Sequence, residues 1–272
     1  MLQRLVPDLR QSLRMMTRQW GFTLAAVATI ALGAGANATV FSLVNAVLLR
    51  PMPIGEPERA LNVHGTDGDG ERFNGFSYPE YQDLARRTRS LTELAAHSEV
   101  SAILQRDGTE LLSGQLVSAN YFDAMKLSPA AGRFFLAEEE PRGAVPVVVL
   151  SYSLWQRRFD ADPDIVGQSL TLSGHGFTVV GVAPPEFRGS FRGVDYVFWV
   201  PIGTRPLLVR QTPGSVSGDM LTSRRITWLD LVGRLTPGTT LGAAQDELTR
   251  LRQSLAMEFE SRDTEPAAEL FP

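Results

Sequence analysis

Hydrophobic residues are distributed unevenly along the chain. From Gly21 to Leu49, 29 consecutive positions contain no Asp, Glu, Lys, Arg or His. A helix needs roughly 20 apolar residues to cross the hydrocarbon core of a bilayer, whereas a cleavable export signal has an apolar region of only about 7–15 residues. The length therefore predicts a transmembrane helix over residues 21–49. It favours a permanent anchor over a cleaved signal or a buried core helix.

The first twenty residues combine arginines with a regular apolar pattern. Hydrophobic residues recur there at three- and four-residue steps, among them Leu9, Leu13 and Met16. This spacing predicts an amphipathic cytoplasmic helix over residues 1–20 that lies on the inner membrane surface or against a partner protein. The alternative is a segment that only orients the anchor. The positive-inside rule places this basic end in the cytoplasm and the chain beyond Arg50 outside.

Small and polar residues within the apolar stretch indicate contacts with other helices. Ala31 and Gly35 are four residues apart, and small faces let helices approach closely in lipid. Asn37 is costly where it faces lipid, so we expect it to meet another helix. We predict that Ala31, Gly35 and Asn37 form a helix-packing site. Ordinary tolerance of glycine in membrane helices is the alternative at Gly35.

Residues 50–260 have the mixed pattern of a water-soluble α+β domain, without the regular alternation of a doubly wound sheet. Strands are predicted where short apolar or alternating runs end at turn residues, and helices where apolar residues recur after a capping residue. The polar segment 261–272 is expected to be a flexible tail. The expected helices cover residues 77–97, 118–126, 152–159 and 239–260, and the expected strands cover residues 59–65, 110–118, 146–151, 168–185 (a hairpin turned at 173–176), 195–202 and 227–235.

Composition excludes several kinds of chemistry. The net charge of -4 argues against a nucleic-acid partner, and the absence of cysteine excludes disulfides and thiolate chemistry. The only lysine, Lys126, follows Met125, so no Walker A loop exists. His64, His97 and His175 are far apart in the sequence and form no HExxH motif. We therefore predict no catalytic, cofactor-binding or metal site, and no enzymatic activity.

Several segments together resemble one known family. RQWGFTLAAVATIALGAGANATVFSLVNAVLLRPMP is similar to the first transmembrane helix of MacB/FtsX-type ABC transporter permeases, in particular the acidobacterial-type duplicated orphan permease branch. FSYPEYQDL, LVSANYFDAMKLSPAAGRFF, VVVLSYSLWQRRFDADPDIVGQSLTLSGHGFTVVGVAPPEF and VGRLTPGTTLGAAQDEL resemble the periplasmic core domain of that family. The resemblance extends from Leu13 to Leu255.

The resemblance implies a bipartite periplasmic domain, with a porter-like α+β lobe and an inserted β-rich lobe, in the bacterial inner membrane. It implies dimerisation or packing against other permease helices, an ABC ATPase acting in trans and a periplasmic adaptor as partners. Family members continue into three further membrane helices, which this sequence does not contain. We therefore expect a non-catalytic subunit or truncated fragment of a permease that transmits motion or binds partners. The alternative is a stand-alone membrane-anchored binding or scaffolding module.

Overall fold

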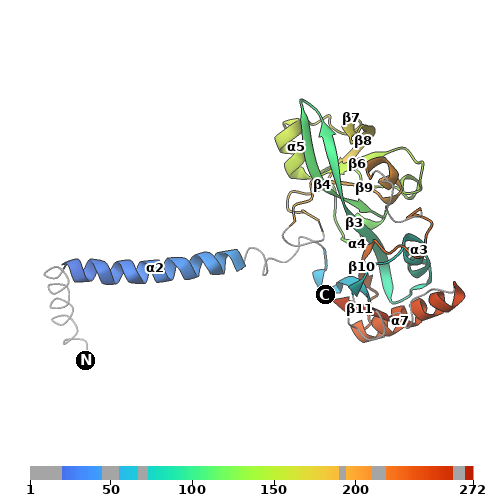
Figure 1. Ribbon diagram of the computed structural model, residues 1–272, viewed down its shortest axis with the longest axis horizontal. Coiled ribbons are helices and arrows are strands. Elements are labelled where there is room, and N and C mark those ends of the chain that lie inside the picture. Colours follow the sequence, from blue (N-terminus) through green and yellow to red (C-terminus); the bar gives the residue numbers. More distant parts are fainter. Residues whose placement is uncertain are drawn as a thin grey trace. The chain divides into compact units, whose positions relative to one another are not determined.

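The computed structural model describes residues 20–44, 55–66, 73–189, 194–209, 219–259 and 267–271. The chain divides into two compact units, Met1–Pro51 and Met52–Pro272 (Figure 1). We describe each unit by itself.

The first unit contains the helix α2, Trp20–Val44, which has 25 residues and no charged side chain. Two of its hydroxyl side chains bond back to the helix: Thr29 and Thr39 donate to the carbonyls of Ala25 and Gly35. Within the described ranges, no helix combines the length and apolarity needed to cross a membrane. Of the predicted amphipathic helix over 1–20, residues 1–19, with Leu9, Leu13 and Met16, lie outside the described residues, and Trp20 begins α2.

The second unit is built on one mixed sheet of eleven strands. The two parallel pairs are β4 with β9 and β6 with β8, and the other pairs are antiparallel. β2 (Phe73–Asn74) pairs with β1, and β7 (Ser169–Leu172) pairs with β3 and β8. In spatial order the remaining strands are β11 (Ala267–Phe271), β1 (Ala60–Thr66), β10 (Asp230–Leu235), β3 (Leu91–Gln105), β4 (Thr109–Val117), β9 (Phe198–Pro201), β6 (Val147–Leu150), β8 (His175–Val182) and β5 (Ala131–Gly132).

The three longer helices of this unit lie toward its two ends (Figure 1). α3 (Tyr78–Arg87) and α7 (Leu241–Glu258) lie near β10 and β11, whereas α5 (Tyr152–Phe159) lies near β7 and β8. The long β3–β4 hairpin extends from one end to the other. The short helical turns are η3 (Pro57–Arg59), α4 (Tyr121–Ala124), η4 (Ala137–Glu139), η5 (Ile202–Thr204) and α6 (Arg205–Leu208).

Side-chain caps determine where the three longer helices of this unit begin. Ser77, Ser151 and Thr240 each accept a hydrogen bond from the backbone amide three residues later, at 3.2, 3.0 and 3.3 Å. These bonds satisfy amides that have no partner within the helix. Apolar residues then recur on one face and pack against the sheet, as with Leu248 and Leu255 of α7, which are buried.

Aromatic side chains form a second core cluster beside the main one. Trp199 and Phe122 are fully buried, and their ring centroids lie 5.8 Å apart in a T-shaped pair. The buried amide of Gln115 accepts hydrogen bonds from Trp199 Nε1 at 2.9 Å and from the Tyr121 hydroxyl at 3.2 Å. Their polar ends are thus satisfied inside an apolar cluster, as burial requires.

Most of the expected elements are present, and the α+β class is confirmed. The helix predicted over 77–97 is wrong beyond Arg87, because residues 91–97 belong to β3 and pair with β10 and β4. The tail predicted over 261–272 also differs in its described part, since Ala267–Phe271 form β11 against β1. Residues 52–272 form one compact unit with a continuous sheet, so the described residues show no break between two separate lobes.

Candidate functional site

Two titratable residues of the sheet, His97 and Asp230, have pKa values shifted by burial. Within the described ranges, no group of three or more His, Asp or Glu residues could hold a metal ion. His97 is buried, and this burial together with the nearby His64 lowers its pKa to about 3, so it is neutral at physiological pH. Burial also raises the pKa of Asp230. Both shifts follow mainly from burial in the sheet, with further contributions from the nearby charges of His64 and, for Asp230, of Glu99.

A buried arginine, Arg234, lies on β10. Its side chain is only 1% exposed, and its Nη1 lies 3.6 Å from Oε2 of Glu56, in keeping with the rule that an arginine is almost never fully buried unless it is paired. It donates from Nη2 to the carbonyl of Gly55 at 2.6 Å and from Nη1 to the carbonyl of Glu56 at 3.0 Å. It also donates from Nε to the carbonyl of Ala124 at 3.1 Å. One guanidinium therefore joins β10, the end of α4 and the segment by which the chain enters the domain.

The segment by which the chain enters the domain, residues 55–59, is called the entry segment, and further bonds near Arg234 hold it. Gly55 donates its amide to the carbonyl of Met125 at 3.2 Å. A side chain at Gly55 would not fit, because a Cβ there would lie 2.7 Å from Cβ of Lys126. Glu56 has a left-handed backbone with φ of 49°, which is costly for a residue other than glycine. The fixed contacts of Gly55 and Glu56 hold this conformation in place.

A second arginine, Arg59, also binds the entry segment to the sheet. Arg59 donates from Nε and Nη2 to the carbonyl of Leu235, at 3.0 and 2.5 Å. It also forms an ion pair with Glu56, with Nη1 and Oε2 separated by 2.7 Å. We call Gly55, Glu56, Arg59 and Arg234 the entry clamp. Burial lowers the pKa of Arg234, and the nearby Glu56 opposes that shift.

The sheet register brings the two ends of the domain together. β1 lies between β10 and β11, so Ala60 is opposite Arg234 and Asn62 is opposite Phe271. The first and last described strands of the domain are therefore neighbours, with the entry clamp beside them. A displacement of residues 55–59 would act directly on the sheet through β1 and β10.

The residues predicted to pack against other helices all lie on α2. Ala31, Gly35 and Asn37 are exposed, and no atom lies within 4 Å of a Cβ added at Gly35. With about 3.6 residues per turn, Ala31 and Gly35 share one face, whereas Asn37 lies about 160° around the helix from Gly35. Helical geometry thus separates Asn37 from the small-residue pair.

Sequence reasoning missed the entry clamp. The only signal was an arginine that follows the apolar residues Leu231 and Val232 in the strand DLVGRL, at a position that the structure buries. The sequence did not indicate which groups would accept its hydrogen bonds.

Comparisons with known proteins agree with this fold. The profile of the MacB-like periplasmic core domain matches residues 23–251. No curated protein matches the chain. Among solved structures, the periplasmic region of MacB from Actinobacillus actinomycetemcomitans is similar with a TM-score of 0.55 and 16% identity, covering 82% of this chain and 92% of that one.

Two further structures show the same fold. A domain of a permease protein from Porphyromonas gingivalis has a TM-score of 0.55 and 16% identity, and the match covers 79% of this chain and 90% of that one. The extracellular domain of the noncanonic ABC-type transporter YknZ from Gram-positive bacteria has a TM-score of 0.53 and 14% identity, with coverage of 78% and 100%. Because the family profile covers most of the sequence, the chain belongs to the MacB-like periplasmic core domain family.

Proposed function

We propose that this chain is a membrane-anchored, non-catalytic extracytoplasmic domain of an ABC transporter permease, and that it transmits movement between the membrane and the periplasm. Membership of the MacB-like periplasmic core domain family supports the transporter role. The observation that carries the mechanical role is the entry clamp, in which buried Arg234 binds the carbonyls of Gly55 and Glu56.

A mechanical role requires a stiff connection where force enters the domain. A loose linker would absorb a displacement by rotating about its own backbone bonds. Here Arg234 joins the entry segment to β10 and to Ala124 at the end of α4, while Arg59 binds the carbonyl of Leu235. A displacement of residues 55–59 would therefore move the sheet as one body, because packed and hydrogen-bonded interiors transmit strain.

The anchor in this proposal is the uncharged stretch from Gly21 to Leu49, with the N-terminus cytoplasmic and the main domain outside the bacterial inner membrane. Ala31 and Gly35 on one face, and Asn37 on another, would meet permease helices or a second copy of the chain. The stripe of Leu9, Leu13 and Met16 would lie on the inner membrane surface. An ABC ATPase in trans and a periplasmic adaptor would complete the assembly.

Affinity purification tests the transporter role. The tagged chain is recovered from gently solubilised native membranes, and co-purifying proteins are identified by mass spectrometry. Recovery of an ABC ATPase or a permease is the expected result. Recovery of the intact, membrane-bound chain by itself would overturn the proposal and favour the stand-alone binding or scaffolding module. In the same assay, Asn37→Leu is expected to reduce recovery, whereas the control Val27→Leu on the same exposed helix is not.

Spin labels test the mechanical role, because the chain has no native cysteine to interfere. Cysteines replace Glu58 in the entry segment and Met257 on α7, both of which are exposed. A stiff clamp predicts a narrow distribution of label distances that stays narrow during ATP turnover in the recovered complex. Arg234→Met should broaden this distribution while ATP hydrolysis continues. A broad distribution in the unaltered chain would refute stiff coupling.

A further inference from the structure

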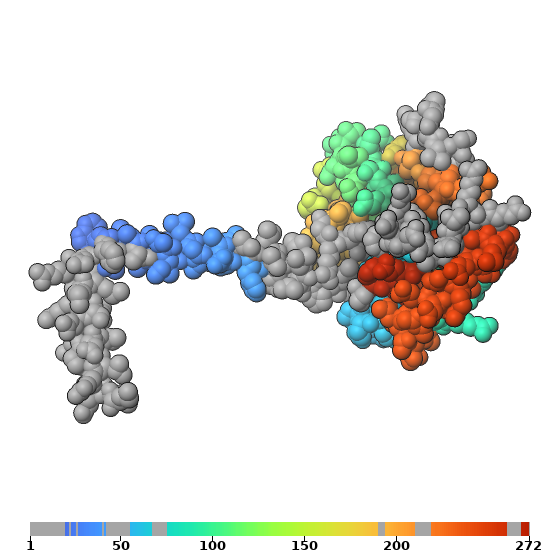
Figure 2. All heavy atoms as spheres, turned by 60° about the horizontal axis from the view of Figure 1, so that its bottom comes forward, coloured from blue at the N-terminus to red at the C-terminus, as the bar shows by residue number. Residues whose placement is uncertain are grey.

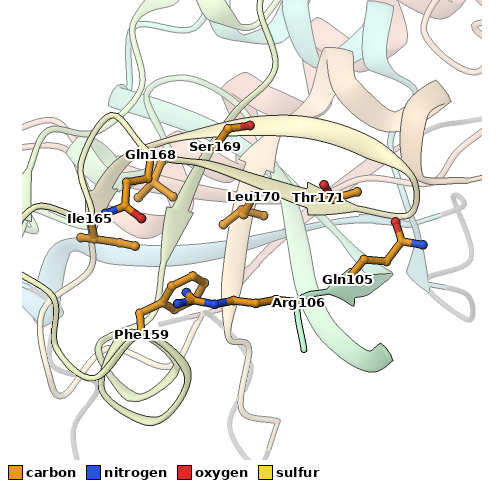
Figure 3. A pocket seen from close by; sticks show the side chains of 9 residues that line it. Gln105, Arg106, Phe159, Ile165, Gln168, Ser169, Leu170 and Thr171 are labelled. Carbon is orange, nitrogen blue, oxygen red and sulfur yellow. The ribbon is translucent and has the colours of Figure 1, made fainter. Parts of the chain in front are cut away.

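A small cavity lies at the end of the domain near α5 (Figures 1 and 3). It has a volume of about 240 Å³. It forms where β7 pairs with β3, at Leu104 opposite Leu172 and Gln105 opposite Thr171, and where α5 ends at Phe159. With Val179 of β8, parts of β3, α5, β7 and β8 therefore line it.

The cavity has an apolar floor and a polar rim. Four buried side chains form the floor: Phe159, Ile165, Leu170 and Val179. The rim includes Arg106 and the amide side chains of Gln105 and Gln168, and the lining contains no Asp or Glu. An apolar pocket with a few polar groups at its edge is the usual form of a small-molecule site.

Arg106 supplies the positive charge of this cavity. Its guanidinium carbon lies 4.4 Å from the centroid of the Phe159 ring. Figure 3 shows the side chain lying along that ring, with Ile165, Leu170 and Gln168 across the cavity. Among the described residues, Arg106 forms an ion pair with Asp107, with Nε and Oδ2 separated by 3.8 Å, and the Asp107 side chain is 92% exposed. Such an exposed ion pair contributes little and leaves the guanidinium able to bind another anion.

We propose that this cavity binds a small apolar monocarboxylate, such as an aryl-substituted or branched-chain acid. The carboxylate would pair with the guanidinium of Arg106, whose planar fork matches two carboxylate oxygens. The apolar body would lie on Phe159, Ile165 and Leu170. The volume agrees with this class, because a dry apolar cavity of about 150 Å³ already holds benzene. The absence of acidic side chains from the lining makes a cationic ligand unfavourable.

A structural role for Arg106 is the alternative reading. The guanidinium would then only cover the Phe159 ring at the end of α5, and the cavity would hold water. The two readings differ in one measurable respect, since only the binding site responds to the charge of an added acid. The proposal does not depend on the transporter role, so either can fail without the other.

The test is a titration of the full-length protein in detergent micelles with 4-fluorophenylacetate, followed by fluorine NMR relaxation. Saturable binding is expected for the unaltered chain. Arg106→Gln is expected to bind about tenfold or more weakly, as for the loss of hydrogen bonds to a charged group. The matched control is Arg157→Gln on α5, outside the cavity lining, and it should bind as the unaltered chain does.

A neutral probe separates the site from partition into micelles. 4-Fluorophenylacetamide has the same ring without the charge. It should therefore bind the unaltered chain more weakly than the acid does. It should bind Arg106→Gln and the unaltered chain with equal affinity. The proposal is overturned if the acid does not saturate with the unaltered chain. It is also overturned if Arg106→Gln binds the acid as tightly as the unaltered chain does.

Discussion

Replacing Arg234 by methionine should release the entry segment before it unfolds the domain. Methionine keeps much of the apolar volume but removes the three donors that bind the carbonyls of Gly55, Glu56 and Ala124. Hydrogen bonds from a charged group contribute about 1.5–3 kcal/mol each, and bonds that share one group do not add fully. We therefore expect a total loss of about 3–5 kcal/mol, similar to breaking other buried charged networks.

Two of the three lost bonds belong to the entry segment, so most of the effect should be local. The amides of Gly55 and Arg59 bond to the carbonyls of Met125 and Glu56, at 3.2 and 3.1 Å. If opening this segment becomes about 3 kcal/mol easier, its amides should exchange roughly a hundredfold faster. Hydrogen–deuterium exchange read by mass spectrometry on peptides covering residues 55–60 measures this change.

A matched control distinguishes local release from general destabilisation. Arg252 on α7 is also buried, with 2% of its side chain exposed, and its Nε donates to Glu80 at 2.8 Å. Arg252→Met should destabilise the domain without selectively exposing residues 55–59. If Arg234→Met and Arg252→Met accelerate exchange at residues 55–59 equally, relative to the core strand β6, Arg234 does not act as a local clamp.

Three further predictions concern the stability of the domain, each measured by thermal or chemical unfolding. Ser77→Ala should cost about 1 kcal/mol, because it removes the cap that accepts from the Glu80 amide. Glu247→Gln should cost about 1 kcal/mol at neutral pH. Burial opposes ionisation of Glu247, but hydrogen bonds from Ser90 and its neighbours outweigh burial and lower the pKa of Glu247 below 4.5. The difference in stability between Glu247→Gln and the unaltered chain should therefore vanish as the pH falls through that lowered pKa. A difference in stability that persists at low pH would contradict this reasoning. Gly203→Ala should cost about 1–3 kcal/mol, because its Cβ would lie 2.0 Å from the carbonyl oxygen of Glu140, whereas Gly242→Ala has open space and should be neutral or stabilising.

Local signals in the sequence were sufficient for several elements. The helix predicted over residues 152–159 has those bounds in the structure, because Ser151 caps it and the preceding apolar run ends there. The turn at Ser173 and Gly174 also joins β7 and β8 as predicted. In these places the capping or turn residue is adjacent in sequence to the helix or strand that it bounds. A short stretch of sequence therefore contains all the residues that determine where the element begins or ends.

The errors arose where pairing partners are distant. In residues 91–97, leucines and alanines fit a helical face, yet this segment pairs with β10 some 130 residues later. Likewise, the segment near the C-terminus is mostly polar, so it did not indicate a strand. Ala268 and Leu270 are two residues apart in this segment, and both are buried next to β1. The secondary-structure propensity of a short sequence window does not account for a partner strand outside that window. Pairing with such a strand overrides the local propensity.

The entry clamp shows why a binding group can be visible in sequence while its site is not. Arg234 binds carbonyls that precede it by 110, 178 and 179 residues. Every residue carries a backbone carbonyl, so the acceptors have no compositional signature that a motif could describe. What the strand DLVGRL did contain was an arginine among apolar neighbours, and burial of that charge is tolerable only with several acceptors. An isolated arginine in an apolar strand therefore predicts that distant backbone groups converge on it, and only the fold identifies them.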